Sequence, residues 1–136
     1  MNKILLFSLS TLLFMSFLIA PGCKKDKEDD RLQFLGTYSV VENCPSFGVN
    51  NFEMAITTSA SSENSVIISN FGDFTVSVTG TVSGNNLTIP QQTQTVQGTA
   101  LNVSGSGTIN GLSLTISYTF SLGSQGESCS MVCTKK

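Results

Sequence analysis

The sequence contains no histidine and no tryptophan, and only 12% of its 136 residues are charged. Without histidine, the chain lacks the residue on which Ser-His-Asp triads and most proton shuttles at neutral pH depend. The five acidic residues within residues 34–136 are scattered near predicted strand ends and turns. No pair of them has the spacing of the two facing carboxylates that a glycosidase needs. We therefore predict a protein that is not an enzyme and that uses no metal and no cofactor.

Basic residues are scarce as well, and the formal net charge at pH 7 is −2. Proteins that bind nucleic acids neutralise phosphates with clustered lysine and arginine side chains. The basic residues of this chain form no such cluster beside aromatic residues. We therefore expect no nucleic-acid partner.

One long apolar run, residues 4–20, follows Lys3 and ends at Pro21 and Gly22, directly before Cys23. A basic residue, an apolar stretch and small residues at its end are the pattern of a secretory signal peptide. The stretch reaches only the lower length limit of a transmembrane helix, and Pro21 ends it. We predict that residues 1–22 are a cleaved signal peptide; a retained membrane anchor is the alternative.

The residues before Cys23 resemble the bacterial lipobox, in which a small residue precedes a cysteine that becomes lipidated. Gly22 matches that position, whereas Ala20 and Pro21 depart from the preferred leucine and small residue. The resemblance implies that Cys23 carries acyl chains and that the membrane is a partner through this anchor. The alternative is an ordinary secretory signal whose Cys23 pairs with another thiol.

Residues 24–31 contain four basic and four acidic side chains and no apolar one. Such a run cannot bury enough apolar surface to order itself, so we assign residues 23–33 to the lipidated cysteine and a solvated tether. The run also resembles the start of mature lipoproteins in Bacteroidetes-type bacteria, where lysine and then acidic residues act as a surface-export signal. The resemblance implies an outer-membrane protein exposed at the cell surface; a periplasm-facing lipoprotein is the alternative.

From Leu35 onward, apolar and polar residues alternate with a period of two, which is typical of strands with one buried face. Residues 112–120 alternate most regularly, and residues 101–109 do so one strand earlier. Asn110-Gly111 between them predicts a two-residue type I′ turn. The other strands that we predict cover residues 38–42, 52–58, 65–70, 74–80, 87–89 and 128–134.

Pro90 has no N–H to donate, so we expect the ladder to end there, with residues 91–99 as a loop or short edge strand. Eight sequential strands with local connections predict an all-β, antiparallel up-and-down meander over residues 34–136. Closure into a small eight-stranded barrel would remove its two exposed edges. The outward faces are rich in Ser, Thr and Asn, which suits water and not lipid.

This domain resembles the small lipocalin-like lipoproteins of Bacteroidetes-type bacteria. The similarity is carried by residues 36–38 at the first strand, residues 86–91, and residues 104–109 before the hairpin. Tyr38 stands where lipocalins have a tryptophan. The resemblance implies a lipocalin-like barrel; an avidin-like or other eight-stranded barrel is the alternative.

Three cysteines remain after Cys23, in a compartment that permits disulfides. Cys129 and Cys133 are about 13 Å apart along one extended strand, too far to pair with each other. In a closed meander the first and last strands are antiparallel neighbours, which brings Cys44 near Cys129. We predict a Cys44–Cys129 disulfide, with Cys44–Cys133 as the alternative.

Two functions remain open: an envelope-anchored scaffold or accessory component that works with an envelope protein partner, and a module that binds a small apolar ligand inside the barrel. The alternative to a ligand cavity is an interior filled by the same side chains. The inward-facing residues that we predict to line such a cavity are Tyr38, Phe52, Met54, Ile56, Leu114, Ile116 and Tyr118, together with Val76, Leu101 and Met131.

Overall fold

The computed structural model describes Gly22 and residues 28–136. The predicted signal peptide, the lipidation site Cys23 and the first part of the tether lie outside these described residues. Within them, no helix combines the length and apolarity that a membrane-crossing helix needs.

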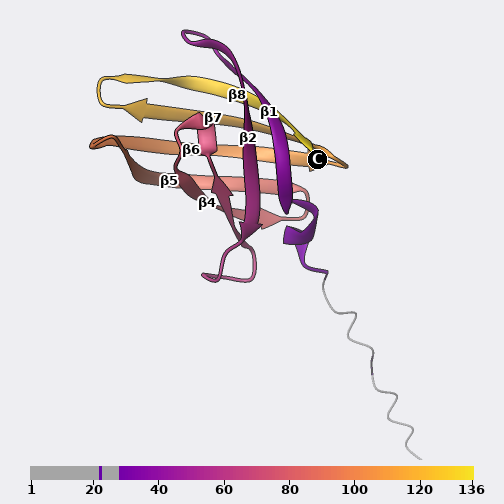
Figure 1. Ribbon diagram of the computed structural model, residues 1–136. Helices are drawn as coiled ribbons and strands as arrows, with labels where there is room; N and C mark the ends of the chain where they lie inside the picture. The colour runs from indigo at the N-terminus through magenta and orange to yellow at the C-terminus, as the bar shows by residue number, and fades with distance from the viewer. Residues whose placement is uncertain (1–21, 23–27) are drawn as a thin grey trace, which may run out of the picture.

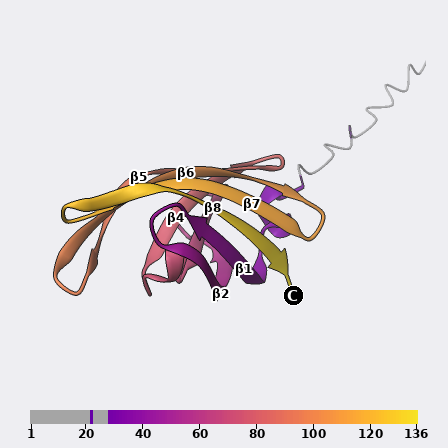
Figure 2. The same ribbon diagram turned by 90° about the horizontal axis from the view of Figure 1, so that it is seen from above.

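Eight antiparallel strands form one closed barrel in which each strand pairs with its neighbours in the sequence and β1 pairs with β8 (Figures 1 and 2). This confirms the predicted all-β, up-and-down meander. The strands are β1 (Gly36–Cys44), β2 (Gly48–Thr58), β3 (Ser65–Ser69), β4 (Ser77–Ser83), β5 (Asn86–Val96), β6 (Thr99–Asn110), β7 (Ser113–Leu122) and β8 (Gln125–Lys135).

Alternation along the strands produces a single core. In β7 every second side chain from Leu114 to Phe120 is buried, and the intervening Ser and Thr side chains are exposed. On the neighbouring strand β6, Gly105 lies opposite Tyr118. A Cβ atom on Gly105 would lie 2.6 Å from the backbone oxygen of Ser117 and 2.6 Å from the Cβ of Tyr118. The missing side chain therefore lets Tyr118 lie directly over β6.

The β6–β7 hairpin forms where we predicted it, but with a different turn. Asn110 pairs with Ser113, so the two loop residues are Gly111 and Leu112. Of these, only Gly111 has a positive φ, at 60°. A glycine at the first central position with a positive φ is the pattern of a type II′ turn rather than the predicted type I′.

Strand β5 does not end at Pro90, so that prediction is wrong. It continues to Val96 and pairs with β6 on both sides of the proline. The register shifts between Ile89 and Gln92, which places Pro90 in an irregularity where its missing N–H breaks no ladder. Residues 91–96 are therefore strand, and only Gln97 and Gly98 form the turn into β6.

The fourth strand begins later than predicted, at Ser77 and not at Phe74. The preceding residues form the 3-10 turn η2 (Phe71–Asp73), in which Phe71 is fully buried. Phe74 and Val76 fit the alternation of the following strand in the sequence, although the backbone joins β4 only at Ser77.

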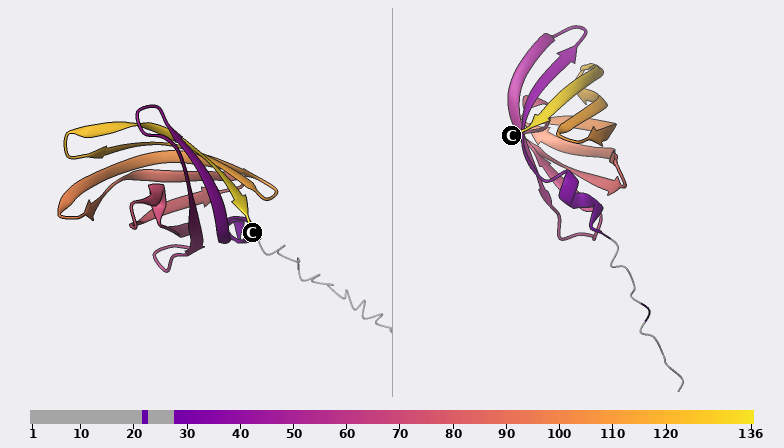
Figure 3. Two further views of the ribbon diagram at one scale, coloured as in Figure 1. Left: turned by 45° about the horizontal axis from the view of Figure 1, so that its top comes forward. Right: turned by 90° about the vertical axis from the view of Figure 1, so that its right-hand side faces the viewer.

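A second 3-10 turn, η1 (Asp30–Gln33), covers the end of the barrel where β1 starts and β8 ends (Figures 1 and 3). The Asp29 side chain caps it by accepting from the Arg31 backbone N–H at 3.0 Å. Phe34 follows with 0% exposure, and its backbone oxygen accepts from the Tyr38 hydroxyl at 2.7 Å. Residues 29–33, which we assigned to a solvated tether, thus pack against this closed end of the barrel.

Candidate functional site

A pocket of about 450 Å³ opens at the opposite, open end of the barrel. It lies between the β1–β2 connection, the η2 segment, the end of β7 and the start of β8. We call it the mouth pocket. Its lining residues are Glu42, Cys44, Phe47, Gly48, Val49, Asn50, Gly72, Asp73, Phe74, Tyr118, Phe120, Leu122 and Gln125.

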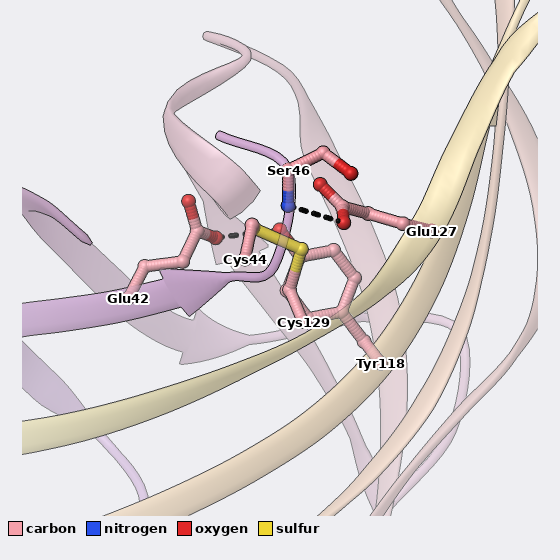
Figure 4. Close-up of a disulfide and its surroundings, with 6 residues drawn as sticks. All are labelled: Glu42, Cys44, Ser46, Tyr118, Glu127 and Cys129. Atoms are coloured by element: carbon pink, nitrogen blue, oxygen red, sulfur yellow. Dashed lines mark hydrogen bonds between the residues drawn. A yellow bond between two sulfur atoms is a disulfide. The ribbon is translucent and has the colours of Figure 1, made fainter. Parts of the chain in front are cut away.

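A disulfide joins Cys44 to Cys129 beside the mouth pocket (Figure 4). Asn43 pairs with Ser130 in the β1–β8 ladder, so Cys44 and Cys129 are the next facing pair, with their Cα atoms 4.5 Å apart. This confirms the predicted pairing and excludes Cys44–Cys133. The Cys133 thiol is free and buried, and burial, with the nearby Glu42 charge, raises its pKa to about 12.

Glu42 is a buried acidic residue, with 6% of its surface exposed. Its strand position gives it the inward parity of Cys44, so its side chain points into the barrel mouth. The Tyr118 hydroxyl donates to the Glu42 Oε1 at 2.5 Å. Burial raises the pKa of Glu42 although this hydrogen bond opposes the rise, and burial also raises the pKa of Tyr118. Burial therefore shifts both groups toward their uncharged forms.

Aromatic rings form the apolar side of the mouth pocket in two tiers. In the lower tier, Phe71 meets Tyr118 edge to face, with ring centroids 4.8 Å apart. In the upper tier, Phe120 lies 5.3 Å from Phe74 and 6.1 Å from Phe47 between ring centroids. Exposure rises from 0% at Phe71 to 61% at Phe47, so the rings extend from the core to the solvent.

The segment between β3 and β4 that carries η2 has an unusual backbone. Asn70, Gly72, Asp73 and Thr75 all have φ between 56° and 61°. A β-branched threonine at positive φ is rare and costly, because its side chain crowds the backbone there. Strain of this kind persists only where the surrounding structure enforces it, and it concentrates at functional sites.

Side-chain amides hold this segment in place. The Asn50 amide on β2 donates to Asp73 Oδ2 at 3.1 Å, and the Asn70 amide donates to the Glu53 backbone oxygen at 2.8 Å. The Asn70 side-chain oxygen accepts from the Thr75 N–H at 3.1 Å. The Asp73 carboxyl is thereby fixed at the pocket wall.

Glu127 lies on the other side of the disulfide from Glu42 (Figure 4). Its Oε2 accepts from the Ser46 N–H at 2.9 Å, whereas its Oε1 is buried with no hydrogen-bond partner. Glu127, Cys44 and Cys129 are the only potential metal-ligand cluster in the part of the chain that the structure describes. Because the two sulfurs are bonded to each other, they offer no thiolate to a metal.

The seven residues that we predicted to line a ligand cavity do not surround one cavity in the structure. Tyr38, Met54, Ile56, Leu114 and Ile116 are 0–1% exposed and belong to the packed core, as do Leu101 and Met131. Phe52 and Val76 are partly buried at its edge. Tyr118 lines the mouth pocket, so it is the predicted lining residue that meets both the core and the pocket.

Sequence reasoning missed the carboxyl and aromatic residues of the mouth. The position of Glu42 could have been predicted, because the alternation along its strand places it on the same inward face as Tyr38 and Cys44. The positions of Asp73 and Phe74 could not, since they depend on the left-handed backbone of the η2 segment.

No family model matches this sequence, and no curated protein matches it either. Among solved structures, the fold is similar to that of a redesigned β-barrel. The TM-score is 0.53 and the identity 11%, over 79% of this chain and 96% of that one. At this identity the likeness shows the β-barrel fold alone.

Proposed function

We propose that this chain is a non-enzymatic, envelope-anchored lipoprotein that binds a small, largely apolar ligand in the mouth pocket. The observation that carries the binding role is an open pocket of about 450 Å³, with aromatic walls, at one end of an otherwise packed barrel. Pockets of this size, with apolar walls and a few placed polar groups, are typical of small-molecule sites. The signal pattern before Cys23 supports the anchor.

Native mass spectrometry of protein purified from its own host tests the binding role. We expect a retained ligand of low mass, and we expect Phe47→Ser to reduce its retention. Phe47 is 61% exposed at the pocket rim, so the fold should tolerate this change. The matched control is Leu112→Ser, a 65% exposed residue in the β6–β7 turn at the closed end. Equal retention in both variants and the unmodified protein would refute binding at the mouth pocket.

The anchor has its own test. Two or more acyl chains hold a protein stably on a membrane, because each buried CH₂ contributes about 0.8 kcal/mol. Cys23→Ala should therefore release the protein from the membrane fraction or stop its processing. Digestion of intact cells with protease distinguishes the proposed cell-surface location, in which the barrel is cleaved or removed, from a periplasm-facing one. A Cys23→Ala variant that fractionates and is processed like the unmodified protein contradicts the lipoprotein proposal.

A second candidate is an accessory component that contacts another envelope protein. Val41 and Val132 face each other across β1 and β8 on the outer surface, with 49% and 50% exposure. They form a small apolar patch on an otherwise hydroxyl-rich face. Val41→Thr with Val132→Thr should abolish co-purification of a partner if this candidate is right, and should leave ligand retention unchanged.

A further inference from the structure

No basic side chain of the described residues is among those that line the mouth pocket. Arg31 belongs to η1, and Lys135 and Lys136 lie beside the start of β1, where Lys135 pairs with Tyr38. Roughly 20 Å of extended strand separates Tyr38 from Cys44 at the other end of β1. In the part of the chain that the structure describes, Arg31 pairs with Asp29 and Lys136 pairs with Glu53, so no basic side chain forms an ion pair with a carboxyl group of the pocket.

The pocket nevertheless holds two carboxyl groups, those of Glu42 and Asp73. The Glu42 side chain is more than nine-tenths buried, and among the described residues only the Tyr118 hydroxyl donates to it. Its other oxygen has no described donor and points away from Tyr118 (Figure 4). This oxygen is not among the buried atoms enclosed by the protein, so it is free to pair with a donor or a positive charge that enters the pocket.

The aromatic rings around the pocket limit which kind of chemical group could pair with Glu42 there. Phe47, Phe74 and Phe120 gather around one side of the pocket, and the faces of aromatic rings attract cations. A small metal ion would lose its water against these rings and gain too few oxygen ligands. An anion would be repelled by the carboxyl groups, and a purely apolar molecule would make no use of the Glu42 oxygen that faces the pocket. An alkylated ammonium satisfies both the rings and the carboxyl groups.

We propose that the mouth pocket binds an organic cation: an alkylated ammonium group, joined to an apolar body, that lies between Glu42, Asp73 and the phenylalanine rings. This inference rests on the proposed binding function and names the class of its ligand. The ammonium pairs with the carboxyl groups, and the apolar body packs along Phe120 and Leu122.

Binding of such a cation is coupled to proton release from Glu42. The titratable groups that face this carboxyl are Tyr118 on β7, Cys133 on β8 and Asp73 in η2, with Glu127 acting on Tyr118. Burial raises the pKa of Glu42, and a bound cation favours its ionised form. Affinity for a quaternary ammonium, which has no proton of its own, should therefore rise with pH as Glu42 ionises.

Isothermal titration calorimetry of the full chain in non-ionic detergent tests the proposal with two probes of matched shape. Benzyltrimethylammonium carries the charge, and neopentylbenzene is its neutral isostere. We expect the cation to bind about tenfold more tightly than the isostere. Glu42→Gln, which retains an acceptor for Tyr118, should abolish most of this preference and its rise with pH.

Asp73→Asn gives an independent test, because asparagine tolerates the φ of 58° at this position. It should weaken binding of the cation several-fold and leave binding of the isostere unchanged. The control Glu63→Gln makes the same charge change in the β2–β3 loop at the closed end and should alter neither affinity. If Glu42→Gln fails to fold, the affinities of Asp73→Asn for the two probes test the proposal instead.

The outcomes separate the two proposals. Equal affinity for the two probes, or a preference that survives both Glu42→Gln and Asp73→Asn, would overturn cation selection and leave the mouth pocket as an apolar binding site. Failure of both probes to bind, together with no retained ligand in the native protein, would overturn the binding function itself.

Discussion

At the closed end of the barrel, Phe34 is fully buried under η1, and Lys135 donates to the Gln33 backbone oxygen at 3.0 Å. At the open end, Phe47 is 61% exposed, a disulfide joins the first and last strands, and a buried carboxyl faces a pocket. One end is completed by apolar packing, whereas the other is joined by a disulfide beside carboxyl groups that line a pocket. The difference indicates that the open end was not shaped for stability alone.

Removal of the disulfide should have the largest effect. The two cysteines are 85 residues apart in the sequence, and the loop-closure entropy removed from the unfolded chain corresponds to about 4.5 kcal/mol. Urea unfolding of the Cys44→Ala, Cys129→Ala double variant should show a loss of that order. Cys133→Ala, the control for loss of a buried sulfur, should cost less. A double variant as stable as the unmodified protein would mean that packing alone secures the open end.

Phe34→Ala should rank second, with a loss of about 3 kcal/mol, because it removes a fully buried ring from under η1. The comparison of the two ends predicts that this variant, measured below its unfolding transition, still binds benzyltrimethylammonium at the mouth pocket. Loss of binding in a folded Phe34→Ala protein would show that the two ends are coupled.

The charge state of Glu42 should give a pH-dependent effect. Because folding raises its pKa, the folded protein holds a proton that the unfolded chain releases. The free energy of unfolding should therefore fall as pH rises from the ordinary glutamate value of 4.5 to the raised value. Glu42→Gln removes this contribution, so its stability relative to the unmodified protein should increase with pH over this range. A constant difference between the two across pH would contradict the raised pKa.

Relief of backbone strain should be the smallest effect. Thr75 has a φ of 59°, which glycine adopts without steric cost. Thr75→Gly should raise the free energy of unfolding by about 0.5 kcal/mol, after the added entropy of the unfolded chain is subtracted. If the strain positions Asp73, the same variant should bind the cation less tightly. Destabilisation by Thr75→Gly would indicate that the η2 segment is not strained.

The fold followed from the sequence because alternation acts locally. The alternation from Leu114 to Phe120 shows directly which side chains face inward. With eight strands joined by local connections, closure of the meander then determines which strands are neighbours. The Cys44–Cys129 pairing followed from that closure. Pro90 misled the prediction, because a register shift accommodates it, and such shifts depend on the partner strand.

The mouth pocket could be predicted only in part. Glu42 stood at an inward position in the sequence pattern, and Tyr118 was identified as a lining residue. Asn70, Gly72 and Asp73 are residue types that tolerate a left-handed backbone, but Phe74 and Val76 continue the strand pattern, so the extent of this segment was not predicted. The position of Asp73 depends on Asn50 from another strand, a contact that exists only after the barrel has closed.

The middle of the barrel is packed, and we propose that binding takes place at the open end. Mapping of amide chemical shifts during a titration with benzyltrimethylammonium tests it most directly. We predict changes concentrated at Gly48, Gly72 and Phe120, with none at Gly84 or Leu112 of the closed end. Changes centred on the core residues Met54 and Ile116 would contradict the claim, because they would place the ligand inside the barrel.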